Sequence, residues 1–60
     1  MKYEKGNVVR LKEQYVTKKD RGKYFQIKEI REDENGYVCQ WINEDCNVDR
    51  FFREHRVKEV

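Results

Sequence analysis

The residues able to form a nucleophile–histidine pair are few: two cysteines, one histidine and one threonine, with no serine in the chain. A catalytic thiol needs a base within hydrogen-bond reach and a pKa low enough to form the thiolate. Cys39 stands between Val38 and Gln40 in a β-rich run, which is typical of a small core residue rather than an accessible nucleophile. The only histidine, His55, is distant in the sequence. We therefore predict that the chain is not an enzyme.

The spacing of the same residue types does not favour a metal site. Structural zinc takes four ligands, commonly including two cysteines about two to four residues apart. Cys39 and Cys46 are separated by six residues, and Asp45 or Asp49 would complete a ligand set without any spacing that requires it. We predict no metal and no cofactor. Because the charged N-terminus lacks the apolar segment of a secretory signal, we expect both cysteines to be reduced thiols in a cytoplasmic protein.

Charge is the more informative feature, because it divides the chain into two parts. The chain has 14 basic and 12 acidic residues, so its net charge is only +2. Residues 1–23 hold eight basic and three acidic residues, whereas residues 29–49 hold one basic and seven acidic residues. The basic residues Lys18, Lys19, Arg21 and Lys23 fall in a polar connection, where they either reach the phosphates of a ligand or serve as solvated surface charges.

Eight aromatic residues are more than a 60-residue core needs. We assign Phe25, Trp41 and one of Phe51 and Phe52 to the core, which leaves several tyrosines for the surface. Aromatic rings beside lysine and arginine suit the stacking of bases or the capture of a peptide. The predicted binding residues are Tyr15, Lys18, Lys19, Arg21, Lys23, Tyr24 and Tyr37.

Composition predicts strands as the elements that position these residues. Ten valines and isoleucines stand against one leucine and no alanine, and β-branched and aromatic side chains favour the pleated sheet. No apolar run is long enough to span a membrane. At 60 residues, a single domain over residues 1–60 with one thin core is expected.

Apolar and polar residues alternate over residues 7–12 and again over residues 23–31, which predicts two strands joined by a long loop. Ile30 is out of phase with Ile27, which indicates a β-bulge. A short amphipathic helix over residues 24–34 is the alternative interpretation.

The rest of the chain predicts a hairpin and two further strands. Asn35-Gly36 indicates a tight turn, because both residue types tolerate positive φ. Strands are expected over residues 37–42, from 46 or 47 to 52, and over 57–60, with a turn at 43–45 and a 3₁₀ turn at 53–56. This order predicts an all-β, five-stranded SH3-like small barrel, and an OB-like barrel is the alternative fold.

Short motifs spread over most of the chain resemble a group of small bacterial and phage proteins. Residues 6–12 read GNVVRLK, residues 38–41 read VCQW, an aromatic follows at Phe51 or Phe52, and the chain closes with valines at 57 and 60. The group has a GDVVxLK opening, a VxCQW strand and an SH3-like fold. Asn7 replaces the aspartate of that pattern, and the basic insert at residues 13–23 is longer than its turn. The resemblance implies an SH3-like barrel.

Two functional hypotheses remain. The first is a monomeric module that binds a protein partner, for example a phage protein that acts on a host protein; the fold, the small net charge and the acidic hairpin favour it. The second is a nucleic-acid-binding KOW- or Tudor-like barrel that uses residues 18–23. The acidic segment and a pI near 8.6 argue for placing this hypothesis second, because nucleic-acid-binding domains commonly have a pI above about 9. No membrane association is expected.

Overall fold

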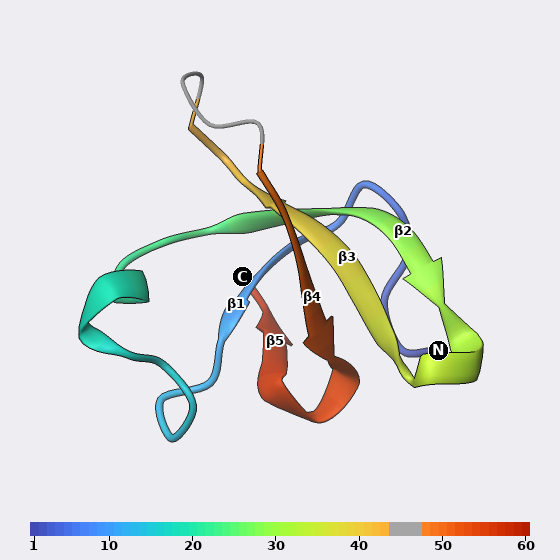
Figure 1. Cartoon of the computed structure of the whole chain (residues 1–60), viewed down its shortest axis with the longest axis horizontal. Helices are drawn as coiled ribbons and strands as arrows, with labels where there is room; N and C mark the ends of the chain where they lie inside the picture. Colours follow the sequence, from blue (N-terminus) through green and yellow to red (C-terminus); the bar gives the residue numbers. More distant parts are fainter. Residues whose placement is uncertain (44–47) are drawn as a thin grey trace.

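The computed structural model describes residues 1–43 and 48–60 (Figure 1). The predicted turn at 43–45 and the start of the predicted fourth strand, together with Cys46, fall largely outside the described residues. In the described part the elements are β1 Val8–Leu11, η1 Lys18–Asp20, β2 Phe25–Arg31, η2 Glu32–Glu34, β3 Gly36–Trp41, β4 Asp49–Arg53, η3 Glu54–Arg56 and β5 Val57–Glu59. The chain is therefore all-β, as predicted, and the alternative of a helix over residues 24–34 is wrong.

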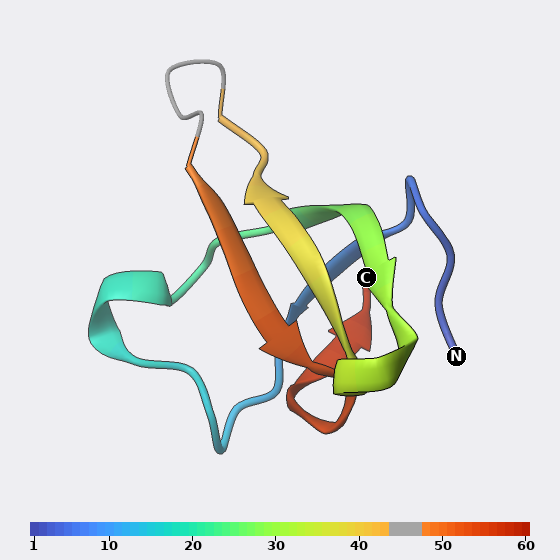
Figure 2. The ribbon, with the colours of Figure 1, turned by 45° about the vertical axis from the view of Figure 1, so that its right-hand side comes forward.

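The strands of the described ranges form one antiparallel sheet in the order β4-β3-β2-β1-β5. Its hydrogen-bonded ladder does not close, so β4 and β5 are the two edges. The sheet is nevertheless strongly curved, and η3 carries the chain from one edge strand to the other (Figure 2). Phe25 on β2 and Phe52 on β4 meet edge-to-face at a centroid distance of 5.0 Å, although β3 lies between their strands.

A β-bulge in β2 contributes to this curvature. The pairing of β2 with β3 shifts between Ile27 and Glu29, so that Ile27 faces Cys39 and Glu29 faces Val38. The bulge predicted from the phase of the isoleucines is thus confirmed. A bulge increases the local twist and bends its strand, which lets a short sheet enclose a core on its concave side.

Alternate strand residues form the core on the concave side. Val9, Phe25 and Val57 are completely or almost completely buried and come from three different strands. Among the residues that the structure describes, the buried apolar ones are Tyr3, Val9, Phe25, Ile27, Tyr37, Cys39, Phe52 and Val57. Trp41, expected in the core, is half-buried and packs against its margin.

The turn between β2 and β3 differs from the predicted one. Asn35 takes the left-handed conformation with φ 52°, but Gly36 does not have positive φ and begins β3. Gly36 is instead required by crowding, because a Cβ atom at this position would lie 2.6 Å from the backbone oxygen of Phe52.

The long connection from β1 to β2 extends from one end of the sheet (Figures 1 and 2). Backbone hydrogen bonds from Tyr15 and Val16 to the Lys12 carbonyl oxygen form a first turn, and η1 forms a second. The predicted long loop between the first two strands is confirmed. Among the described residues, no helix has the length and apolar character needed to cross a membrane.

Candidate functional site

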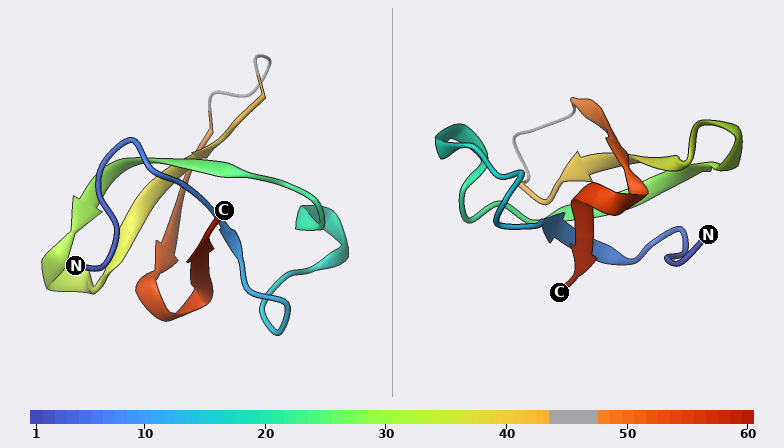
Figure 3. Two further views of the ribbon diagram at one scale, coloured as in Figure 1. Left: turned by 180° about the vertical axis from the view of Figure 1, so that it is seen from behind. Right: turned by 90° about the horizontal axis from the view of Figure 1, so that it is seen from below.

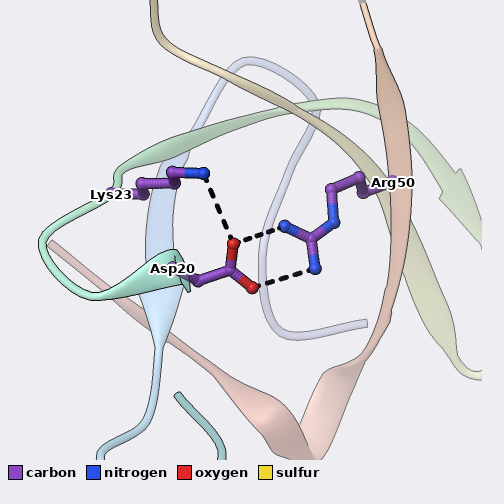
Figure 4. Close-up of polar contacts among 3 residues, drawn as sticks. All are labelled: Asp20, Lys23 and Arg50. Carbon is purple, nitrogen blue, oxygen red and sulfur yellow. Dashed lines mark hydrogen bonds and ion pairs between the residues drawn. The ribbon is translucent and has the colours of Figure 1, made fainter. Parts of the chain in front are cut away.

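A buried carboxylate attaches the β1–β2 loop to the far edge of the sheet (Figure 4). Asp20, at the end of η1, is only 4% exposed. The two terminal nitrogens of Arg50 on β4 donate to its two carboxylate oxygens at 2.7 and 3.0 Å. Lys23 lies on the other side of the carboxylate, with its Nζ 3.5 Å from Oδ1. The loop is therefore connected to β4 across the opening of the sheet.

The electrostatics of this cluster follow from its geometry. The hydrogen bonds from Arg50 lower the pKa of the Asp20 carboxyl below its usual range, an effect that outweighs the opposing influence of burial. The same pairing raises the pKa of Arg50. Planar pairing of a guanidinium with a carboxylate is among the stronger ionic contacts in proteins. Because two cations share one carboxylate, the cluster keeps a surplus of positive charge.

That surplus borders an apolar hollow beside Trp41. The Lys23 ammonium lies 4.2 Å from the centroid of the indole ring, within the range of a cation–π contact. The guanidinium of Arg50 lies 5.0 Å from the ring centroid of Phe52. The hollow has a volume of about 230 Å³ and is lined by Lys19, Lys23, Phe25, Trp41, Val48 and Arg50.

Trp41 also lines a second, shallower hollow of about 370 Å³. Its other lining residues are Val8, Gly22, Tyr24, Ile42 and Val60. Several apolar side chains of the two hollows face solvent: Ile42 is 52% exposed and Val48 is 65% exposed. We call the residues of both hollows together the Trp41 surface. It combines the exposed apolar side chains of two adjoining hollows with the cationic groups of Lys19, Lys23 and Arg50.

The structure brings three of the seven predicted binding residues to this surface. Lys19 and Lys23 line the first hollow, and Tyr24, which is 44% exposed, lines the second. Lys18 is exposed on η1 and does not line either hollow. Arg21 points instead to Glu13, at 3.9 Å, in an exposed ion pair.

Two predicted tyrosines lie elsewhere. Tyr15 packs edge-on against His55 at a centroid distance of 5.4 Å, at the η3 end of the molecule. The expected exposure of Tyr37 is wrong, because this residue is completely buried. Its hydroxyl donates to Glu54 at 2.5 Å and accepts a hydrogen bond from the backbone N–H of Tyr3 at 3.0 Å. Tyr37 therefore fixes the N-terminal segment, and its ring has no exposed area in the folded protein.

Sequence reasoning missed several residues of the site. The burial of Tyr37 could have been predicted from the alternation of side chains along a strand. Tyr37, Cys39 and Trp41 are each two residues apart on β3 and therefore share a face. Ile42, Val48 and Val60 each follow or precede a strand, where periodicity carries no information about exposure. The pairing of Asp20 with Arg50 joins residues 30 apart in sequence, and no local pattern indicates it.

The described residues do not present other groupings with evident chemistry. Across residues 1–43 and 48–60, no three His, Cys, Asp or Glu residues lie close enough together to hold a metal ion. Cys39 is fully buried, and desolvation raises the pKa of its thiol to about 12. A thiol in this environment is an inert core group.

Comparison of the chain with protein-family models, with curated protein sequences and with solved structures gives no match. Function therefore has to be inferred from the residues of the site themselves. Among the described residues, the Trp41 surface brings exposed apolar side chains, aromatic rings and lysines together in one place.

Proposed function

We propose that this chain is a small, non-enzymatic binding module of the SH3-like barrel class that holds a segment of a partner protein on the Trp41 surface. The observation that carries the proposal is the exposed apolar floor around Trp41 with Lys19 and Lys23 at its rim. Contiguous apolar area bordered by polar residues commonly marks an interaction site on a small protein. Such a surface suits an acidic segment that also carries bulky apolar side chains.

The SH3-like assignment draws support from the arrangement of elements. The order β4-β3-β2-β1-β5, the long β1–β2 loop and the single 3₁₀ turn between β4 and β5 are all features of that class. The bulge in β2 supports it further, because small barrels need a bend of this kind in a central strand.

A peptide fits this surface better than a nucleic-acid base does. The Lys23 ammonium already lies over the Trp41 ring, where a stacked base would compete with it. The rim is also partly neutralised by Asp20, which leaves a modest rather than a strong positive charge. Carboxylates next to apolar side chains complement both properties, because they pair with the rim while the apolar groups cover the floor.

Selection from a displayed library of random peptides tests the proposal while the partner is still unidentified. We expect enrichment of sequences in which one or two acidic residues adjoin a large apolar residue. Synthetic peptides of that sequence should bind the wild type and lose at least about tenfold in affinity with Ile42→Ser or Lys19→Glu, as expected for changes at a contact centre.

Phe51→Ser is the matched control for the apolar substitution. Phe51 is 39% exposed on β4 but lines neither hollow of the Trp41 surface. The control should retain the wild-type affinity. Failure to enrich any peptide, or binding that is insensitive to Ile42→Ser and Lys19→Glu, would exclude this surface as the site.

A further inference from the structure

β1 and the edge strand β5 pair at one side of the sheet (Figure 3), and we call these two strands the β1–β5 ribbon. Cations lie opposite one another across this ribbon. Arg10 on β1 lies directly opposite Lys58 on β5 in the antiparallel register. Leu11 and Val57 form the last pair of the two strands. Beyond them the backbone N–H of Lys12 donates to the carbonyl oxygen of Arg56 at 2.9 Å, so Lys12 and Arg56 form the next pair. Two successive like-charged pairs are therefore placed across the same ribbon.

The side chains of all four cations are at least partly exposed. Val9 and Val57 point into the core, where they are 0% and 1% exposed. Because side chains alternate along a strand, Arg10 and Lys58 point to the opposite, solvent-facing side. Lys12 follows Leu11 and continues the alternation of β1, whereas Arg56, the last residue of η3, is exposed and its guanidinium lies 5.3 Å from the centroid of the Tyr15 ring. We call Arg10, Lys12, Arg56 and Lys58 the cation ladder.

Like charges directly opposite one another in a sheet destabilise it. Within the described residues, no member of the cation ladder forms an ion pair, that is, none has a carboxylate oxygen within 4.0 Å of its charged nitrogen atoms. Two neighbouring acidic residues are engaged elsewhere, Glu13 with Arg21 and Glu54 with Tyr37. The ladder thus places like charges opposite one another without an ion pair in the described part of the molecule.

The basic loop at residues 18–23 differs from the cation ladder because some of its cations form ion pairs. Lys23 lies beside Asp20, and Arg21 lies beside Glu13, so half of its four cations have acidic partners. Concentrated positive charge without acidic partners among the described residues is instead found on the β1–β5 ribbon.

We propose that the cation ladder binds the phosphate backbone of a nucleic acid, independently of the surface around Trp41. Residues two apart on a strand are about 6.7 Å apart, close to the separation of successive phosphates along one nucleic-acid strand. Two pairs of cations across the ribbon then face two or more consecutive phosphates. Contacts of this kind release counterions and carry no sequence information, so binding is independent of base sequence and sensitive to salt. A bound polyanion also removes the repulsion within the ladder.

The test is fluorescence anisotropy of a labelled oligothymidylate over a range of salt concentrations, together with thermal melting of each variant. With four phosphate contacts, log K should fall against log salt with a slope of about −2.8 for a single strand. Lys58→Glu removes one contact and pairs the new carboxylate with Arg10, so the slope should fall to about −1.4 and the affinity at low salt at least about tenfold. The same change replaces repulsion by attraction in the sheet, so the melting temperature should stay the same or rise.

Lys18→Glu provides the matched control, because it makes the same change in net charge at an exposed residue of η1 outside the ladder. It should lower the affinity less than about threefold and leave the slope unchanged. Arg10→Gln and Lys58→Gln repeat the test without reversing a charge, and Arg10→Lys should retain binding. The proposal is overturned if the wild type does not bind at low salt, if Lys58→Glu binds as the wild type does, or if Lys18→Glu weakens binding as much as Lys58→Glu.

Discussion

Arg50 on β4 binds both carboxylate oxygens of Asp20, a residue of the β1–β2 loop that is 30 positions earlier in the chain. This contact connects the edge strand β4 to a loop whose own strands, β1 and β2, are separated from β4 by β3. It also fixes the direction of Lys23, whose ammonium lies between the same carboxylate and the ring of Trp41. The Trp41 surface therefore depends on a contact that lies beneath its rim.

The first prediction concerns the stability that this pair supplies. Asp20→Asn removes the charge of a buried group and leaves Arg50 without its partner. We expect the free energy of unfolding in urea to fall by about 2 kcal/mol, less than for a fully buried pair because Arg50 keeps contact with water. Glu13→Gln, which breaks the exposed pair with Arg21, should change the free energy of unfolding by less than about 0.5 kcal/mol. Equal effects of the two substitutions would contradict this account.

The second prediction is the dependence of stability on acid. Hydrogen bonds from Arg50 hold the pKa of Asp20 below its ordinary value of 3.8. A carboxyl whose pKa is lower in the folded state stabilises the fold fully above its unfolded pKa, and this contribution is lost as the pH falls through the folded value. Unfolding measured from pH 6 downward should therefore show wild-type stability falling below about pH 4. The difference between the wild type and Asp20→Asn should shrink over the same range, and a constant difference would count against the assignment.

Much of the strand layout was predictable because it depends on local alternation. The first two strands, the bulge after Ile27 and the 3₁₀ turn before the last strand all lie within one or two residues of their predicted positions. Each of these features follows from the phase of neighbouring side chains, which the sequence carries directly. The curvature of the sheet depends on contacts such as Phe25 with Phe52 and is not a local property.

The candidate site was less predictable for the same physical reason. The basic loop could be predicted from the sequence, but the contacts of its lysines could not. Lys19 remains at the surface, whereas Lys23 contacts Asp20 and the ring of Trp41. The pairing of Arg10 with Lys58 depends on which strand lies beside β1 at the edge of the sheet. Register between the first and last strands cannot be read from either strand alone.

The third prediction uses the buried hydroxyl of Tyr37. Desolvation, assisted by the hydrogen bond to Glu54, raises the pKa of Tyr37 from 10.0 to about 12. A group with a raised pKa in the folded state stabilises the fold fully below its unfolded pKa, and the contribution is lost as the pH rises toward the folded value. Wild-type stability should fall between pH 10 and 12.

The raised pKa of Cys39 also makes stability depend on pH in the alkaline range. Tyr37→Phe separates the contribution of the Tyr37 hydroxyl from that of the Cys39 thiol. At neutral pH the variant should lose about 1–2 kcal/mol, because Glu54 and the N–H of Tyr3 lose a hydrogen-bond partner. The difference between the two proteins should decrease above pH 10 as the wild type loses its advantage. A difference that does not change with pH would refute the role given to the hydroxyl.

The fourth prediction is that Cys39 reacts only when the protein unfolds. The thiol is fully buried, and burial raises its pKa to about 12, so the thiolate is scarce at neutral pH. In a Cys46→Ala background, iodoacetamide should label the native protein at least about a hundredfold more slowly than free cysteine at the same pH. Labelling in denaturing urea should reach the rate of the free amino acid. Rapid labelling of the native protein would show an accessible thiol and reopen the question of cysteine chemistry.

The fifth prediction concerns Gly36, the first residue of β3. A Cβ atom there would lie 2.6 Å from Cε1 of Phe51 and 2.6 Å from the backbone oxygen of Phe52. Gly36→Ala should therefore destabilise the fold by about 1–3 kcal/mol, as overpacking does elsewhere. Adding Phe51→Ala removes the ring but not the carbonyl group, so the double variant should recover only part of the loss attributable to position 36. A double-mutant cycle in urea measures that coupling, and complete recovery would show that the ring alone excludes a side chain from this position.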